Sequence, residues 1–131
     1  MKKKLKRLPD AELEIMKVIW SNNYPISTSQ IKEILDKERA WNVSALQTLL
    51  NRLIEREFLD SYKESKNRYY TPLVTEEQYL AYENKSFLEK VNGSSVTKLI
   101  ASLYNSNSIT KKDLEELSEF ISQKTRREKH D

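Results

Sequence analysis

The sequence has no cysteine, one glycine and one histidine. Without cysteine the chain forms neither disulfides nor thiolate metal sites, and this suits a cytoplasmic protein. Gly93 is the single glycine, and one glycine cannot form a glycine-rich loop of the kind that binds phosphate. The single histidine, His130, lies next to the last residue, and the carboxylates are scattered among lysines as on solvated helix faces. These absences argue against an enzyme and against a bound cofactor or metal.

Long apolar runs are also missing, so the sequence predicts no membrane insertion, and no signal-peptide pattern follows the basic start MKKKLKRL. Charge, in contrast, is abundant: 33% of the residues are Asp, Glu, Lys or Arg, and the net charge is +3. Residues 1–74 hold 14 Lys and Arg against 10 Asp and Glu, whereas residues 75–131 hold 9 against 10. The N-terminal half, with its balance of +4, would attract a polyanion.

Three segments of the N-terminal half show helical spacing of apolar residues. The first, LPDAELEIMKVIW, begins near a proline and has acidic residues in its first turn. The second carries Ser27 and Gln30 at capping-box spacing. The third is predicted to start at an Asn42 N-cap and to run to about Arg56. Because a short connection joins the second and third segments, they predict a helix-turn-helix.

Beyond Phe58 the periodicity changes from helical to alternating. Segments rich in β-prone residues at 59–63 and 68–73 flank the polar tetrapeptide ESKN, which indicates a hairpin with a basic tip. The tip lacks glycine, so we expect a loop longer than a two-residue turn. A helix-turn-helix followed by such a hairpin is a winged helix. Residues 1–74 are therefore predicted to form a winged-helix DNA-binding domain.

The third predicted helix has two contrasting faces. Its apolar stripe consists of Leu46, Leu49, Leu50 and Leu53. Its other side carries neutral hydrogen-bonding residues and one arginine: Ser44, Gln47, Thr48, Asn51 and Arg52. A solvated face normally carries Glu and Lys, whereas amides and arginine suit the major groove of DNA, where they bridge adenine and guanine edges. We therefore predict that this helix recognises DNA; a polar surface without a partner is the alternative.

Basic residues also occur at the hairpin and at the start of the chain. Lys63, Lys66 and Arg68 lie on or near the predicted wing, where contacts with phosphates or the minor groove are expected. A solvated hairpin tip is the alternative. The run from Lys2 to Arg7 is either a phosphate-contacting arm or a disordered tail.

The spacing of apolar residues in 75–131 predicts three further helices, followed by a frayed end. A unit of this size has a marginal core alone, and its apolar residues occupy more than one helix face. Two copies packed together would bury them, so we predict a homodimer. The dimer contacts are assigned to Leu80, Phe87, Val96, Leu99, Ile100, Leu103, Leu114, Leu117 and Ile121. The predicted fold class is mainly α with a small β-hairpin: a winged helix-turn-helix plus a C-terminal three-helix dimerisation domain.

Three stretches, LPDAELEIMKVIW, AWNVSALQTLLNRL and RYYTPLVTEEQYL, carry a resemblance to a known family. In order and spacing they resemble the penicillinase repressors BlaI and MecI, with the CopY copper repressors as relatives. The resemblance implies a dimeric winged-helix repressor of the antibiotic response that binds a palindromic operator in double-stranded DNA. It also implies that the C-terminal helices dimerise and that a membrane sensor protease is a further partner.

The chain departs from the family pattern at three places. Arg56-Glu57 stands where family members usually have a basic residue and glycine, so a differently built turn is expected. The copper-responsive relatives carry cysteine pairs that this chain lacks. In the β-lactam-responsive members a protease cuts an Asn-Phe bond in the second C-terminal helix. The positions that align here are Ser102 and Leu103, which we name as the candidate proteolytic switch.

The sequence thus predicts a homodimeric, sequence-specific transcriptional repressor. One alternative is a winged-helix protein-interaction module that does not bind nucleic acid, and the positive N-terminal half argues against it. Another alternative is a regulator that senses a small ligand in a pocket between its domains.

Overall fold

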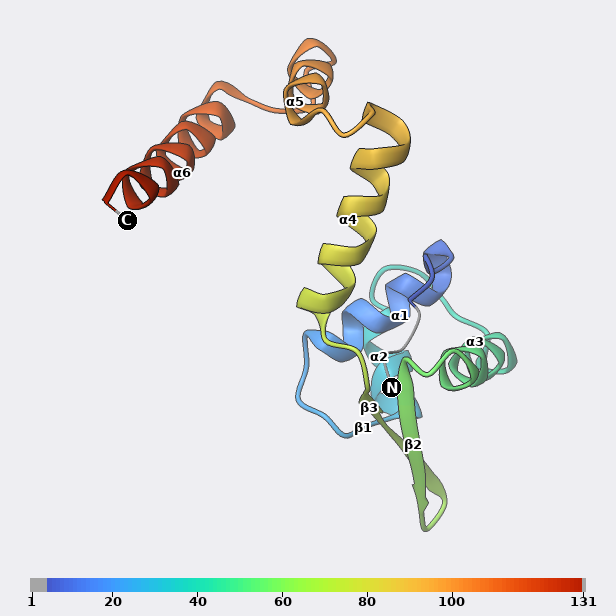
Figure 1. Cartoon of the computed structure of the whole chain (residues 1–131). Coiled ribbons are helices and arrows are strands. Elements are labelled where there is room, and N and C mark those ends of the chain that lie inside the picture. The colour runs from blue at the N-terminus through green and yellow to red at the C-terminus, as the bar shows by residue number, and fades with distance from the viewer. Residues whose placement is uncertain (1–4, 131) are drawn as a thin grey trace. The chain divides into compact units, whose positions relative to one another are not determined.

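The computed structural model describes residues 5–130, with side chains up to position 126 (Figure 1). Lys2, Lys3 and Lys4 of the predicted arm lie outside the described residues. Within them the elements are α1 (Asp10–Trp20), β1 (Ile26–Ser27), α2 (Thr28–Leu35), α3 (Val43–Glu55), β2 (Leu59–Glu64), β3 (Asn67–Pro72), α4 (Glu76–Asn92), α5 (Val96–Asn105) and α6 (Lys111–His130). No described helix is long and apolar enough to span a bilayer.

Helices α2 and α3 begin where the capping residues predict. The Ser27 side chain accepts from the Gln30 backbone N–H and the Gln30 side chain accepts from the Ser27 N–H, which completes the predicted capping box. Asn42 Oδ1 accepts a hydrogen bond from the Ala45 backbone at 3.0 Å. Capping of this kind satisfies backbone donors that a helix leaves unpaired at its first turn. The predicted starts of both helices are confirmed.

The sheet has three antiparallel strands in the order β1-β3-β2, and its hairpin tip differs from the prediction. Glu64 pairs with Asn67, so only Ser65 and Lys66 form the turn. The expected longer loop is therefore wrong. Ser65 takes a φ of 57°, the left-handed conformation that a tight hairpin turn requires. The paired ladder on both strands holds this serine where glycine is more usual.

The turn after α3 has the hydrogen bonds of a helix that ends in a left-handed residue. Glu57 has a φ of 64°, Phe58 N–H donates to Leu53 O at 2.9 Å, and Glu57 N–H donates to Ile54 O at 3.0 Å. Glycine usually occupies such a position because it has no Cβ to clash. The turn therefore keeps a glycine-like backbone around a glutamate.

An ion pair between the buried carboxylate of Glu12 and the more exposed Arg56 ties α1 to the end of α3. Glu12 is 1% exposed, and its Oε1 lies 3.0 Å from Arg56 Nε. The sequence pattern placed Glu12 among the acidic residues of the first turn and did not predict its burial. Because a buried charge is costly without a partner, this pair fixes the end of α3 against α1.

The chain forms two compact units, divided between Asn84 and Lys85, inside α4. The sequence placed the division ten residues earlier, after position 74. Tyr79 explains the difference: it is 2% exposed, belongs to the core of the first unit, and accepts a hydrogen bond from Leu8 N–H at 2.7 Å. Burial raises the pKa of Tyr79 to about 12, so its hydroxyl stays protonated.

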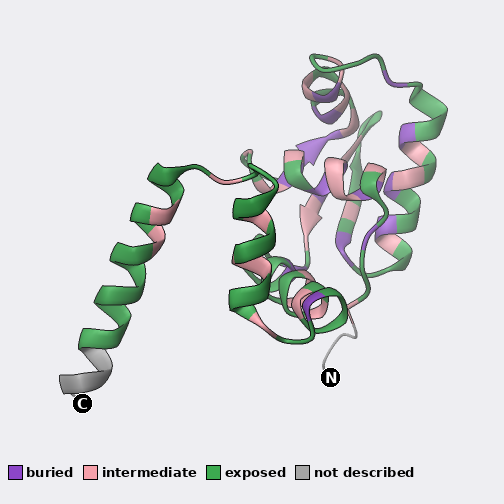
Figure 2. Cartoon of the chain, turned by 90° about the horizontal axis from the view of Figure 1, so that it is seen from above, coloured by how far each residue is buried: buried purple, intermediate pink, exposed green. Residues whose placement is uncertain are grey.

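The second unit has no hydrophobic core of its own. From Lys85 to Arg126 no apolar side chain is buried (Figure 2). Its helices are nevertheless well formed: the predicted Thr110–Asp113 capping box is present, and Gly93 follows α4 with a φ of 57°.

Helix α6 continues to His130, so the expected frayed end after residue 124 is wrong for that stretch. Before that stretch, Lys124 Nζ lies 5.5 Å from the centre of the Phe120 ring, one helical turn earlier.

Candidate nucleic-acid interface

Helix α3 separates its leucines from its polar residues as the pattern predicts. Leu46, Leu50 and Leu53 are fully buried, and Leu49 packs partly buried against the same core. On the other side Ser44, Thr48, Asn51 and Arg52 are exposed, and Gln47 is half-buried. Within the described residues the Arg52 guanidinium has no hydrogen-bond or ion-pair partner. The helix thus presents an open polar face.

Among the described residues, Gln47 differs from the other four because its side chain also bonds to a residue outside α3. Its Nε2 donates to Asn51 Oδ1 at 3.1 Å and to Tyr70 Oη at 3.3 Å. Tyr70 is fully buried on β3, and Thr28 Oγ1 of α2 donates to the same hydroxyl at 3.4 Å. These contacts join α2, α3 and β3 beneath the polar face. Only the side-chain oxygen of Gln47 remains available, and it can accept a hydrogen bond from a base.

A cationic groove lies between α2, α3 and the hairpin. It encloses about 420 Å³ and is lined by Thr28, Ser29, Lys32, Val43, Gln47, Lys63, Lys66, Asn67 and Arg68. The structure therefore brings the three predicted wing cations together with Gln47. The ammonium groups of Lys63 and Lys66 have no partner within the described residues, and Arg68 donates to Ser61 Oγ at 3.0 Å. Such a groove suits phosphate oxygens, which accept hydrogen bonds from lysine, arginine and hydroxyl groups.

Five groove residues were missed by the sequence reasoning: Thr28, Ser29, Lys32, Val43 and Asn67. A signal existed for two of them. Thr28 and Ser29 are hydroxyl residues in the first turn of α2, and a helix N-terminus favours anions. The sequence does not show that this turn faces the hairpin, because the two lie about forty positions apart.

The turn between α2 and α3 is fixed by one carboxylate. Asp36 Oδ2 accepts from Lys32 Nζ at 2.6 Å, and Asp36 Oδ1 accepts from the Trp41 backbone N–H at 2.9 Å. The Lys32 hydrogen bond, followed by the Trp41 one, holds the pKa of Asp36 below its usual range. This carboxylate therefore links the groove cation Lys32 to the start of α3.

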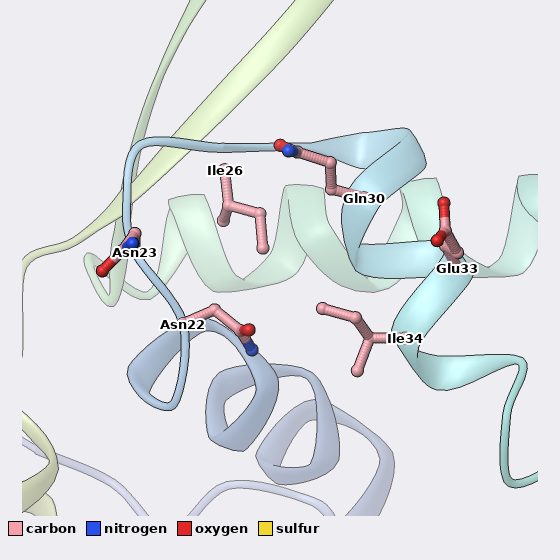
Figure 3. Close-up of a pocket in the computed structure, with 6 residues that line it drawn as sticks. All are labelled: Asn22, Asn23, Ile26, Gln30, Glu33 and Ile34. Carbon is pink, nitrogen blue, oxygen red and sulfur yellow. The ribbon is translucent and has the colours of Figure 1, made fainter.

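A second cavity of about 370 Å³ lies between the end of α1, β1 and α2 (Figure 3). Asn22, Ile26 and Ile34 point into it, and Asn23, Gln30 and Glu33 complete its lining. Its one charged residue is acidic. Two of its amides are already engaged, since Asn22 Nδ2 donates to Val18 O and Gln30 caps α2. This cavity does not have the chemistry of a polyanion site.

Comparison with known proteins gives consistent matches. A family model described as Penicillinase repressor matches residues 8–123. The chain is 30% identical to the penicillinase repressor of Bacillus licheniformis over 127 residues, which is 97% of this chain and 98% of that protein. It is 28% identical to the methicillin resistance regulatory protein MecI of Mammaliicoccus sciuri over 124 residues, covering 95% of this chain and all of MecI.

Two solved structures are similar to the N-terminal part. The solution structure of the DNA-binding domain of the repressor BlaI matches with a TM-score of 0.51 and 39% identity, over 60% of this chain and 94% of that one. The monomeric form of Bacillus licheniformis BlaI in complex with the blaP half-operator matches with a TM-score of 0.50 and 40% identity, with the same coverage.

Proposed function

The chain belongs to the penicillinase-repressor family, whose members are DNA-binding transcriptional repressors rather than enzymes, and from this membership we propose that it binds a palindromic operator as a homodimer. The observation that supports the DNA site best is the open polar face of α3 beside the cationic groove. The half-operator complex of BlaI supports the same assignment, because there a single relative chain occupies half of an operator.

Within this proposal α3 enters the major groove and the hairpin is the wing. Arg52 and the amides of Asn51 and Gln47 read base edges, and Ser44 and Thr48 contact bases or nearby phosphates. Thr48 Oγ1 already donates to Ser44 O at 3.0 Å, so it meets DNA as an acceptor. Lys63, Lys66 and Arg68 bind phosphate oxygens from the wing.

The homodimer is supported by the apolar side chains that residues 75–131 leave exposed. Four of the nine side chains assigned to dimer contacts are about half exposed or more: Leu80 at 49%, Phe87 at 48%, Val96 at 58% and Ile121 at 53%. The other five (Leu99, Ile100, Leu103, Leu114 and Leu117) are half-buried. A second copy of the same helices would remove these apolar surfaces from water, which is the main force in such association. We therefore assign residues 75–131 to dimerisation and 1–74 to DNA binding.

A gel shift with genomic fragments tests operator binding, and sedimentation at micromolar concentration tests the dimer. We expect a dimer whose half-sites lie about one DNA turn, or a multiple of it, apart. Val96→Glu should give monomers with weakened operator binding, because it places a charge in the apolar contact. Thr97→Glu, on the same helix but outside the assigned contacts, is the matched control. Wild-type protein that stays monomeric with full operator affinity contradicts the proposal.

Derepression follows physically from losing the dimer. Two tethered DNA-binding domains bind more tightly than one, by a factor of about 10² to 10⁴. We propose that a membrane sensor protease relieves repression by cutting near Ser102-Leu103, inside α5, which separates α6 and the end of α5 from the rest of the chain. Ser102 is exposed, but Ser102 O accepts from Ser106 N–H at 3.1 Å, so α5 must unwind locally before this bond enters a protease site.

Two measurements test this regulation. A specific protease site placed at 102–106, once cut, should lower operator affinity; unchanged affinity after complete cutting refutes the role of the dimer. Mass spectrometry of the protein from induced cells should show the cleaved chain. An intact chain during derepression refutes cleavage and favours a ligand-sensing regulator, for which a thermal-shift ligand screen is the direct assay. We therefore propose that the repressor acts in the cytoplasm, the compartment that holds its operator DNA.

A further inference from the structure

Val43 is an exposed apolar residue at a position where the fold does not need one. It is the first residue of α3, and 58% of its surface is exposed. Valine is a weaker helix former than alanine or the long polar residues, and an exposed valine contributes little to packing. Apart from the small Ala45, the other exposed residues of α3 are polar or charged. Neither the stability of the helix nor the core explains this side chain.

The position of Val43 gives its methyl groups a specific neighbourhood. Val43 lines the cationic groove together with Gln47, one helical turn further along the same face. The other groove residues are lysines, an arginine, an asparagine and hydroxyl residues, all suited to phosphates or base edges. In helix-turn-helix proteins the first residues of the recognition helix are those that contact base edges.

DNA offers few apolar partners at that place. In the major groove the base edges present hydrogen-bond donors and acceptors, and the apolar exception among the four bases is the C5-methyl group of thymine. From the exposure of Val43 and its place in the groove, we propose that Val43 contacts a thymine methyl group and so selects a T·A pair at one position of each half-site. This inference rests on the proposed function, because it needs α3 in the major groove.

The test compares thymine with uracil, which pairs identically but lacks the methyl group. The probes are duplexes that this protein enriches from a random pool, with each thymine replaced singly by deoxyuridine. We expect one position per half-site at which uracil lowers wild-type affinity by about three- to fivefold, the effect of one buried methyl group. Val43→Ala should lower affinity for the thymine duplex by a similar factor and should be insensitive to uracil at that position.

Two controls keep the test decisive. Leu73 is also exposed but does not line the groove, so Leu73→Ala should keep the uracil effect. Val43→Ala should melt no lower than the wild type, because the valine side chain is exposed and alanine is the better helix former. If uracil changes nothing at any position, or if Val43→Ala remains sensitive at the same position, the methyl contact is refuted while the repressor function stands. If no duplex is enriched, the proposed function is refuted and the contact with it.

Discussion

At the scale of single residues, Glu57 is the clearest case of backbone geometry that opposes residue type. Its φ of 64° costs a residue with a Cβ about 1 kcal/mol or more relative to glycine. We expect Glu57→Gly to be more stable than Glu57→Ala by about 1 kcal/mol, since the two differ in the Cβ and share the loss of the carboxylate. Urea denaturation measures this. Equal midpoints for the two variants would show that the turn relaxes without cost.

Also at the residue scale, Arg52 and Lys66 should differ in how they affect binding. Arg52→Ala removes an unpaired guanidinium from the polar face and should cost about 1–3 kcal/mol on the preferred operator, with relaxed preference at one base position. Lys66→Ala removes a groove cation from the hairpin tip and should weaken all sequences alike. Binding to a set of single-base operator variants measures both patterns. If Arg52→Ala weakens every sequence equally, Arg52 is a phosphate contact.

At the scale of elements, the connection between α2 and α3 should be sensitive to acid through Asp36. A carboxyl group whose pKa is lowered by folding adds stability that is present above its unfolded pKa, near 3.8, and is lost as the pH falls through its lower folded value. Asp36→Asn should therefore melt below the wild type at pH 7 and 5, and the difference should shrink at pH 3 and below.

Lys32→Gln is the matched variant for Asp36, because it removes the main cause of the lowered pKa and keeps the carboxyl group. Its difference from the wild type should shrink with acid in the same way. A melting difference that stays constant from pH 7 to pH 2 for both variants would show that Asp36 does not link the two helices energetically.

At the scale of the whole molecule, the number of groove cations predicts how salt affects operator binding. Lys32, Lys63, Lys66 and Arg68 line the groove, and Lys32 is already paired with Asp36. A dimer therefore neutralises about six to eight phosphates, which predicts a slope of log K against log salt between about −5 and −7.

Titrations at several salt concentrations measure this slope. Lys66→Ala should make it shallower by about 2, since a dimer loses two cations. Asn67→Ala, in the same groove but uncharged, should leave it unchanged. A wild-type slope shallower than about −2 would contradict phosphate binding in the groove.

The local features of this protein, namely where helices start and which face of a helix is apolar, follow from the sequence alone. The starts of α2 and α3, the Thr110–Asp113 box and the leucine stripe depend on residues three or four positions apart, so helical spacing predicts them. The polar face of α3 was predicted for the same reason. The resemblance of three short stretches was enough to predict the family that the comparisons confirm.

Other features were decided only by the tertiary structure, because they join residues distant in sequence. Strand β1 forms only where Ile26 and Ser27 meet β3, too short a segment to show alternation. Tyr70 holds Gln47 from 23 positions away, and buried Glu12 forms its ion pair with Arg56 at the other end of the domain's helical region in sequence. The groove likewise needs α2, α3 and the hairpin to converge, so its cations can be predicted one by one from the sequence but not as a single site.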